Sequence, residues 1–233
     1  MFHMTFMNMI HIFDLDDTLY EELLFVKSGF LAVAIFGEEQ FGLAIKDSYS
    51  FMLDILRQKG RGSVFDNWLK ASGCYNKERV RMCINIYRQH NPDIVLYESA
   101  KKLLNDLESE SLYLVTDGHK MVQANKVEAL GISNYFKHVY LTHRYGIKYA
   151  KPSLHCFKLI KRREQCAWED LVYVGDNPKK DFVNLNTAGA HTVRVHTGPY
   201  KDLEAKKEHD ARYHLADLGA YLKLIGGLNK HCH

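Results

Sequence analysis

The chain has 233 residues, a length that suits one medium domain or a core domain carrying a smaller insertion. Hydrophobic residues make up 46% and charged residues 25%, which excludes a disordered chain, and the net charge of +3 comes without the long basic run that would indicate nucleic-acid binding. No stretch approaches the roughly 18 apolar residues of a membrane span, and the apolar start MFHMTFMNMI lacks the basic region and cleavage site of a signal peptide.

Five short apolar runs predict the buried strands of a parallel sheet. They cover residues 9–13, 111–115, 138–141, 171–174 and 190–195. Helical patterns separate them: one includes Leu103 and Leu107, one ends before Gly131, one is opened by Pro152 and one is closed by Gly189. Strands that alternate with helices indicate an α/β fold with a doubly wound, Rossmann-like parallel sheet.

Residues 21–93 interrupt this alternation, because they contain no convincing strand. Helical stretches are predicted instead over residues 22–36, 48–59 and 77–90. A connection of this length is too large for a loop. We therefore expect an α-helical insertion over residues 21–93, packed as its own small domain, and a core domain made of residues 1–20 and 94–233.

Within the predicted insertion, Trp68 and Tyr75 are expected in the hydrophobic core. Arg88 and His90 lie where the insertion rejoins the core domain. One of them could touch a substrate, but a structural hydrogen bond is the favoured interpretation.

Polar residues follow four of the five predicted strands. Ligands of open parallel sheets bind at the carboxyl ends of the strands, so these residues are expected on one rim. The four groups are Asp14-Leu15-Asp16-Asp17-Thr18, Thr116-Asp117-Gly118, Lys151-Pro152, and Gly175-Asp176-Asn177 with Asp181 one turn later. The rim would thus combine carboxylates, a hydroxyl, an ammonium group and glycine backbone.

This combination favours phosphoryl transfer. Several carboxylates repel a phosphate, so the site requires a cation, and hard oxygen ligands select Mg²⁺. One carboxylate can then act as a nucleophile, and a second can serve as general acid and then as base. Lysine, threonine and backbone N–H groups can bind the transferring oxygens.

The motifs resemble those of the haloacid dehalogenase-like superfamily, in its phosphatase branch with a helical cap after the first strand. The resemblance implies that the insertion, residues 21–93, is an α-helical cap domain and that residues 1–20 and 94–233 are the Rossmann-like catalytic core. All four family motifs occur in order behind the expected strands, and the resemblance covers nearly the whole chain. They stand as Asp14, Asp16 and Thr18 in DxDxT, Thr116 in LVTDG, Lys151 in AKPS, and Asp176 and Asp181 in GDNxxxD.

The resemblance implies a role for each acidic residue. Asp14 would be the nucleophile and a ligand of Mg²⁺. Asp16 would be the general acid/base, with its backbone carbonyl on the metal, and its presence favours C–O–P or P–O–P chemistry. Asp176 would be the remaining carboxylate on the metal, and Asp181 would support the site, through water or by holding Lys151.

The other motif residues are implied to handle the phosphate. Thr116, with the backbone of Asp117 and Gly118, would bind the phosphoryl oxygens, and Lys151 would neutralise charge. Thr18 and Asn177 are supporting residues. Many relatives have Asn at the place of Asp117, so its carboxylate either adds charge near the phosphate or, as we favour, caps the next helix.

Four neighbouring residues have simpler interpretations than a functional one. Asp17 is expected at a helix start, and Lys148 is expected on the solvated surface. Gln123 and Lys126 fit the pattern that follows the second motif in relatives, yet a helix-surface position explains them equally well.

The five cysteines show no CxxC spacing and are odd in number, which favours reduced thiols in a cytoplasmic protein. The ending His231-Cys232-His233 could bind stray metal, but a frayed terminus is the simpler interpretation.

The expected function is Mg²⁺-dependent hydrolysis of a small-molecule phosphate monoester through an aspartyl-phosphate. A sugar phosphomutase, a pyrophosphatase, or a non-catalytic regulatory or binding protein are the alternatives; the intact motif set argues against the last. The expected partner is a small phosphorylated metabolite, without nucleic acid or membrane. The sequence indicates neither the leaving group nor the oligomeric state.

Overall fold

The computed structural model describes residues 9–228, so the predictions about the first eight residues and about His231-Cys232-His233 lie outside the described residues. The chain divides into two compact units. One spans Leu23–Ile94, and the other contains the described residues up to Glu22 and from Val95 onward. Within residues 9–228, no helix has the length and apolar character needed to cross a membrane.

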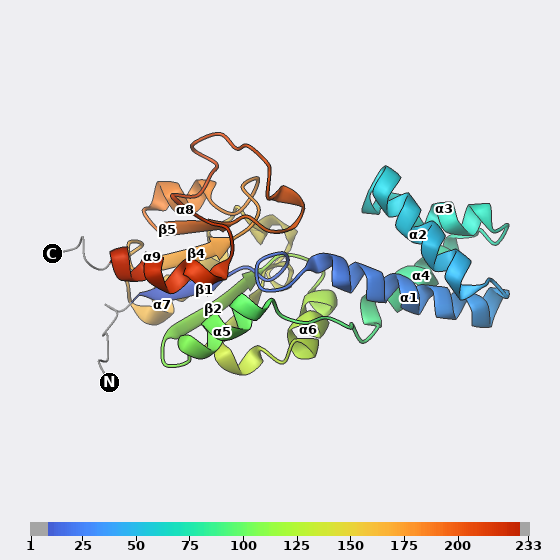
Figure 1. The fold of residues 1–233 in the computed structure, drawn as a ribbon, viewed down its shortest axis with the longest axis horizontal. Helices are drawn as coiled ribbons and strands as arrows, with labels where there is room; N and C mark the ends of the chain where they lie inside the picture. Colours follow the sequence, from blue (N-terminus) through green and yellow to red (C-terminus); the bar gives the residue numbers. More distant parts are fainter. Residues whose placement is uncertain (1–8, 229–233) are drawn as a thin grey trace. The chain divides into compact units, whose positions relative to one another are not determined.

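A six-stranded sheet with all strands parallel forms the centre of the larger unit (Figure 1). The strand order is β3-β2-β1-β4-β5-β6. The strands are β1 (Ile10–Phe13), β2 (Ser111–Thr116), β3 (His138–Leu141), β4 (Leu171–Gly175), β5 (His191–Val195) and β6 (Tyr213–Leu215). This arrangement confirms the predicted doubly wound α/β fold.

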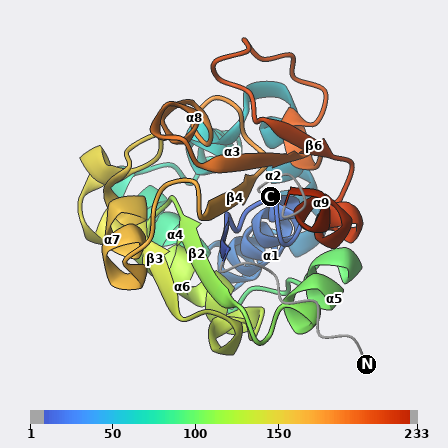
Figure 2. The ribbon, with the colours of Figure 1, turned by 90° about the vertical axis from the view of Figure 1, so that its left-hand side faces the viewer.

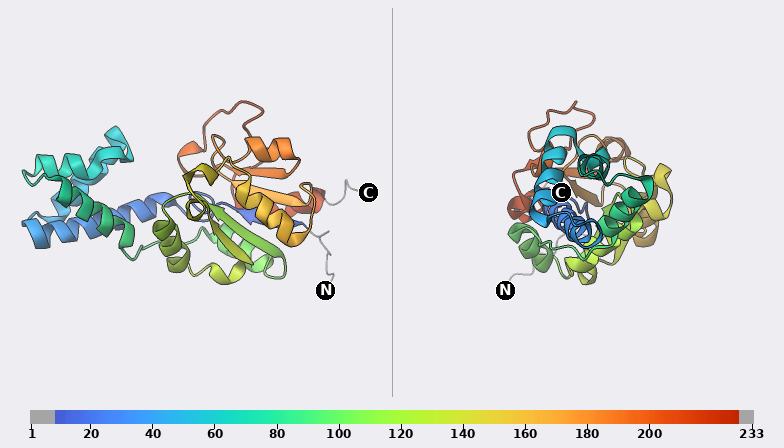
Figure 3. Two further views of the ribbon diagram at one scale, coloured as in Figure 1. Left: turned by 180° about the vertical axis from the view of Figure 1, so that it is seen from behind. Right: turned by 90° about the vertical axis from the view of Figure 1, so that its right-hand side faces the viewer.

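Five helices flank this sheet. They are α5 (Glu98–Asp106), α6 (Lys120–Ala129), α7 (His155–Glu164), α8 (Val183–Ala188) and α9 (Tyr221–Leu228). Figure 2 shows α7 and α8 on one face of the sheet and α5 and α9 on the other, and Figure 3 shows the sheet from behind. Covered faces explain why the strands read as continuous apolar runs in the sequence.

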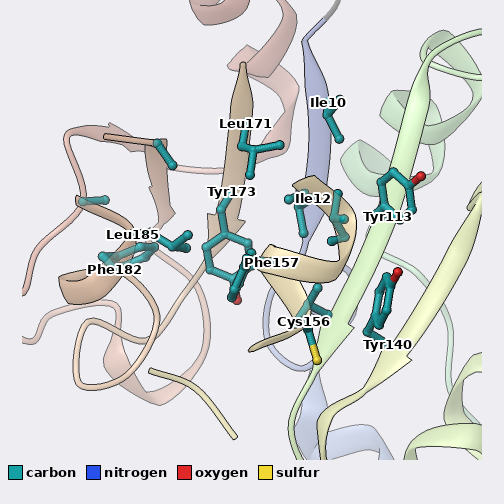
Figure 4. Packing of buried hydrophobic residues seen from close by; sticks show 14 residues of the cluster. Ile10, Ile12, Tyr113, Tyr140, Cys156, Phe157, Leu171, Tyr173, Phe182 and Leu185 are labelled. Atoms are coloured by element: carbon teal, nitrogen blue, oxygen red, sulfur yellow. The ribbon is translucent and has the colours of Figure 1, made fainter. Parts of the chain in front are cut away.

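Strand β1 is buried on both of its faces. Ile10 and Ile12 belong to a core cluster with Phe157 of α7 and Tyr173 of β4 (Figure 4). His11, which points to the other face because side chains alternate along a strand, lies with its Nδ1 atom 2.7 Å from the hydroxyl of Tyr221 on α9. Packing on both faces fixes the position of the residues that follow β1.

The smaller unit consists of four helices with their own hydrophobic core. They are α1 (Glu22–Phe41), α2 (Ile45–Lys59), α3 (Val64–Ala71) and α4 (Lys77–Gln89). Trp68 is buried in this core, as expected. Tyr75 is 39% exposed and lies under the amine of Lys70, so its predicted core position is wrong. His90 makes structural hydrogen bonds to Ser28 Oγ at 2.8 Å and to the Tyr87 carbonyl at 2.7 Å.

Four elements differ from the sequence prediction. Strand β6 was not predicted, because an edge strand of three residues is too short to form an apolar run. Helices α3 and α9 were not predicted either. Pro152 does not open α7, which begins at His155; the proline instead follows Lys151 in the connection from β3, joined by a cis peptide bond.

Candidate active site

The polar residues predicted at the strand ends gather where the order of the strands reverses. The sheet extends from β1 through β2 to β3 on one side and through β4 to β6 on the other. Asp14 directly follows β1, and Asp176 directly follows β4. Ligands of doubly wound sheets bind in the crevice outside such a switch point, so the topology alone marks these two carboxylates.

Three buried carboxylates form a compact cluster at this point. Asp14, Asp176 and Asp181 each offer one oxygen, and these oxygens all lie within 4.8 Å of one another. Each of the three residues is at most 4% exposed. This is the donor set that a hard divalent cation prefers, and the described residues contain no other such group of three or more His, Cys, Asp or Glu side chains.

Burial and nearby negative charge make two carboxylates of the cluster, Asp14 and Asp176, hard to ionise. Burial raises the pKa of Asp14 to about 6, with a further contribution from Asp181, although Lys151 and Lys180 act in the opposite direction. Burial, followed by the charges of Asp181 and Asp14, raises the pKa of Asp176 to about 9. Lys151 and Lys180 therefore do not fully balance the negative charge of the carboxylates. A divalent cation bound at the cluster would supply the missing positive charge.

Lys151 links two of these carboxylates. Its ammonium nitrogen lies 2.8 Å from Asp14 Oδ1 and 2.9 Å from Asp181 Oδ1. The same nitrogen donates a hydrogen bond of 2.8 Å to the hydroxyl of Tyr173. Burial lowers the pKa of Lys151, but Asp14 and Asp181 outweigh it and raise that pKa well above its usual value. The lysine is therefore a fixed positive charge at the cluster.

Asp16 faces a different environment from Asp14. Its Oδ1 accepts hydrogen bonds from the Tyr20 hydroxyl and from Lys126 Nζ, both at 2.6 Å, and its Oδ2 accepts one of 2.8 Å from Gln123 Nε2. Burial alone would raise the pKa of Asp16, but Lys126 and these hydrogen bonds outweigh it and lower the pKa below its usual value. In the protein without substrate, Asp16 is thus favoured in its carboxylate form.

The helix-surface interpretation of Gln123 and Lys126 is therefore wrong. Both side chains are buried, and Gln123 Nε2 also donates a hydrogen bond of 2.6 Å to Thr116 Oγ1. Residues three apart on a helix share one face, so the spacing in α6 was the available signal. What the sequence lacked was evidence that this face meets Asp16.

The prediction that Asp117 caps a helix is also wrong. Helix α6 begins at Lys120, and His119 occupies its N-cap position. Asp117 lies two residues further from the helix. The carboxylate of Asp117 instead accepts hydrogen bonds from Thr142 Oγ1 at 2.7 Å and from the backbone N–H of Lys151 at 3.1 Å. It therefore ties the loop after β2 to the connection that carries the buried lysine.

Lys180 is a charged residue of the rim that the sequence reasoning missed. Its ammonium group lies 3.5 Å from Asp117 Oδ2, and the surrounding carboxylates, with Asp14 first, raise its pKa despite burial. Its position between Asp176 and Asp181 was the available signal. Lys148, by contrast, is exposed as predicted.

The supporting residues Asn177 and Thr18 are both buried. The backbone N–H of Asn177 donates a hydrogen bond of 2.9 Å to Asp181 Oδ2. Among the residues that the structure describes, the Thr18 hydroxyl has no hydrogen-bond partner.

The turn after β1 is braced by the loop that follows β5. Asp17 has a positive φ of 53°, and its carbonyl accepts a hydrogen bond from the Thr197 hydroxyl. The Asp17 carboxylate accepts a hydrogen bond of 3.0 Å from the backbone N–H of Glu22, the first residue of α1, which confirms the expected helix-start position. A residue 180 positions away thus holds the turn that carries Asp14 and Asp16.

We expect Gly198→Ala to disturb this turn. A Cβ atom at Gly198 would lie 2.5 Å from the Cβ of Asp17, and the φ of +62° is itself unfavourable for alanine. The expected result is a loss of about 1–3 kcal/mol of stability together with reduced catalytic activity, measured by thermal unfolding and steady-state rates. Gly62→Ala is the matched control, since its Cβ would meet nothing within 4 Å. Equal behaviour of the two variants would contradict the bracing role.

Comparison with known proteins gives the family. The sequence model described as "Haloacid dehalogenase-like hydrolase" matches residues 11–195. The chain therefore belongs to the haloacid dehalogenase-like hydrolases. It is 32% identical to the glyceraldehyde 3-phosphate phosphatase of Methanocaldococcus jannaschii over 94% of this chain and 97% of that protein. The chain is a phosphatase of this family.

Solved structures agree with the fold. A HAD-superfamily hydrolase of subfamily IA, variant 1, from Geobacter sulfurreducens superposes with a TM-score of 0.70 at 18% identity, covering 94% of this chain and 96% of that one. The HAD hydrolase YfnB from Bacillus subtilis, solved with magnesium bound, gives a TM-score of 0.66 at 18% identity, covering 93% and 98%. At this level of identity the comparison supports the arrangement of the elements.

Proposed function

We propose that this phosphatase hydrolyses a small-molecule phosphate monoester with Mg²⁺ and through an aspartyl-phosphate on Asp14. The observation that carries the proposal is the buried arrangement of Asp14, Lys151 and Asp181 beside Asp176 at the switch point of the sheet. A carboxylate held next to a lysine and a cation-binding cluster can attack a phosphorus atom without being repelled by its charge.

The donor set fits Mg²⁺. The carboxylates of Asp14 and Asp176 and the backbone carbonyl of Asp16 would hold the ion, all of them oxygen ligands. When bound, Mg²⁺ would supply the positive charge that lets an anionic phosphate approach this rim. Asp181 is placed to support the site by holding Lys151.

The proposed reaction has two steps. A carboxylate oxygen of Asp14 attacks phosphorus, and the P–O bond to the leaving group breaks. The leaving oxygen takes a proton from Asp16, which must enter this step in its protonated form. Asp16 then removes a proton from water, which attacks the phosphoryl group and regenerates Asp14 with release of phosphate. The Thr116 hydroxyl and the backbone N–H groups of Asp117 and Gly118 are proposed to bind the phosphoryl oxygens.

The contact between Lys126 and Asp16 gives a test of the acid/base assignment. Lys126→Met removes the leading influence that lowers the pKa of Asp16, so that pKa should rise and the acidic limb of the pH–rate profile should move to higher pH. Lys126→Arg keeps the charge and should leave the limb near its wild-type position. A profile that is unchanged in Lys126→Met would contradict the role of Asp16, whereas a purely structural effect would lower rates equally at all pH values.

The substrate class is proposed from the relatives. The Methanocaldococcus jannaschii relative is named for glyceraldehyde 3-phosphate, which makes small phosphorylated sugars such as triose phosphates the first compounds to assay.

We also propose that Leu23–Ile94 is the cap domain. A cytoplasmic location is also part of the proposal, and it rests on the cysteine spacing in the sequence.

Asp14→Asn is the decisive experiment. The amide keeps the size of the side chain but is not a nucleophile, so release of phosphate from every member of a metabolite panel with Mg²⁺ should fall to the background level. Asp54→Asn, an exposed acid outside the site, is the control. Phosphate release that survives in Asp14→Asn would overturn the assignment of the nucleophile. If the unmodified protein returned a substrate as an isomer without releasing phosphate, the protein would be a mutase.

A further inference from the structure

Two histidines lie side by side at the β6 edge of the sheet, outside the carboxylate cluster. His196 directly follows β5, and His214 is the middle residue of β6. His196 Nε2 and His214 Nδ1 are 3.0 Å apart, and the two rings are inclined by only 31°. The backbone N–H of His196 donates a hydrogen bond of 2.9 Å to the carbonyl of Leu215. Sheet pairing therefore fixes both residues in register.

The outer nitrogen of each ring faces an acceptor. His196 Nδ1 lies 2.7 Å from the carbonyl oxygen of Lys201. Because a carbonyl can only accept, Nδ1 carries the hydrogen in the neutral ring, and the lone pair of Nε2 points at His214. His214 Nε2 lies 4.0 Å from Asp210 Oδ2. This distance is too long for a hydrogen bond, so in the metal-free protein His214 Nδ1 carries the hydrogen that it donates to His196 Nε2. A metal ion would replace that hydrogen, and the ring hydrogen of His214 would move to Nε2, the nitrogen nearer to Asp210.

Asp210 is itself held in place by a buried cation. Arg194, which is 1% exposed, lies with Nη1 3.1 Å from Asp210 Oδ1. Arg194 also donates hydrogen bonds to the carbonyls of Tyr200 and Leu203, at 2.6 and 2.9 Å. The acceptors around the histidine pair are thus part of a fixed connection between β5 and β6.

We propose that His196 and His214 form a binding site for a borderline divalent transition-metal ion such as Zn²⁺. Histidine ligands of metals characteristically donate their other N–H to a carbonyl or carboxylate. His196 has this arrangement, and the carboxylate of Asp210 lies 4.0 Å from the outer nitrogen of His214. Zinc–nitrogen distances are about 2.0–2.1 Å, so two nitrogens 3.0 Å apart would subtend an angle of about 95° at one ion.

The chemistry separates this site from the carboxylate cluster. Imidazole nitrogens suit Zn²⁺, Cu²⁺ or Ni²⁺, whereas Mg²⁺ prefers oxygen ligands. The side chain of His214 is 43% exposed, so water can complete the coordination. An ion bound by residues on β5 and β6 would bind only the folded sheet and would therefore raise its melting temperature.

The test is titration of the full-length protein with Zn²⁺ in excess Mg²⁺, followed by calorimetry and thermal unfolding. The C-terminal His231-Cys232-His233 is a competing chelator, so the parent is the variant His231→Gln/Cys232→Ser/His233→Gln. We expect this parent to bind one Zn²⁺ with a rise in melting temperature. His196→Gln and His214→Gln, each made in it, should weaken binding at least about tenfold and remove the rise. His138→Gln, an exposed histidine on β3, is the control and should behave as the parent.

Two results would overturn the proposal. One is a parent that binds no Zn²⁺ in excess Mg²⁺. The other is a His214→Gln variant, made in the parent, that keeps the parent's affinity for Zn²⁺ and its rise in melting temperature. Because His214 is exposed, this variant should fold even if His196→Gln does not, and circular dichroism would establish that it does.

Discussion

Lys151→Met is expected to slow turnover strongly and to destabilise the folded protein at neutral pH. The lysine nitrogen contacts Asp14 and Asp181 at 2.8 and 2.9 Å, with all three side chains almost fully buried. Methionine fills similar space but leaves two buried carboxylates without their shared counter-charge. Removal of one partner from a buried ion pair typically costs about 3–5 kcal/mol.

The same substitution should act on the proposed nucleophile. Lys151 is the leading influence that lowers the pKa of Asp14, which burial has already raised to about 6. Without the lysine, this pKa should rise further, and a larger share of Asp14 should be protonated at pH 7. Together with the lost stabilisation of the transferring phosphate, we expect kcat to fall by about 10²–10³-fold.

Steady-state kinetics and thermal unfolding at several pH values measure both effects. Lys148→Met is the matched control, because this lysine lies three positions earlier and is exposed. The rate of the Lys151→Met variant should recover partly as the pH rises, since ionised Asp14 then becomes more abundant. A variant with wild-type kcat and melting temperature would show that the ion pair serves neither catalysis nor stability.

The positions of the main acidic residues of the candidate site could be predicted from the sequence, because the end of a buried strand is visible in the local pattern of residues. Each motif directly follows an apolar run, and parallel strands bring their carboxyl ends to one edge. That logic is sufficient to bring Asp14 close to Asp176. It also predicts the sheet itself, since five of the six strands are long enough to form an apolar run.

The residues that hold these groups in place were not predictable in the same way. The partners of Asp16 on α6 and the partner of Asp117 after β3 depend on how separate elements pack. Thr197 contacts Asp17 across 180 positions of sequence. No pattern within one segment contains that information, because a side chain that caps a helix and one that bridges two loops have the same local sequence.

The second large effect is expected from the metal: binding of Mg²⁺ at pH 7 should release a proton. In the metal-free protein, burial and the charges of Asp181 and Asp14 raise the pKa of Asp176 to about 9. This carboxyl is therefore protonated at neutral pH, and it must lose its proton to become a metal ligand. The apparent affinity for Mg²⁺ should accordingly fall as the pH is lowered.

The sign of the effect on stability follows from the same shift. Between the ordinary pKa of 3.8 and about 9, the folded metal-free protein binds more protons at Asp176 than the unfolded chain does. The free energy of unfolding should therefore fall as the pH rises through this range. Asp14 adds to the slope between 3.8 and about 6. Mg²⁺ should restore stability most strongly at the alkaline end.

Calorimetric titration with Mg²⁺ in two buffers of different ionisation enthalpy measures the proton release directly. Asp176→Asn removes the titrating group and should abolish both the release and most of the slope of stability against pH. Asp54→Asn, an exposed acid, should leave both unchanged. A metal-free protein whose stability rises between pH 6 and pH 9, or Mg²⁺ binding whose heat is independent of the buffer, would mean that Asp176 is already ionised and that another charge balances the cluster. Lys180 would then be the first residue to test, because its pKa is raised by Asp14 and Asp181 on the same rim.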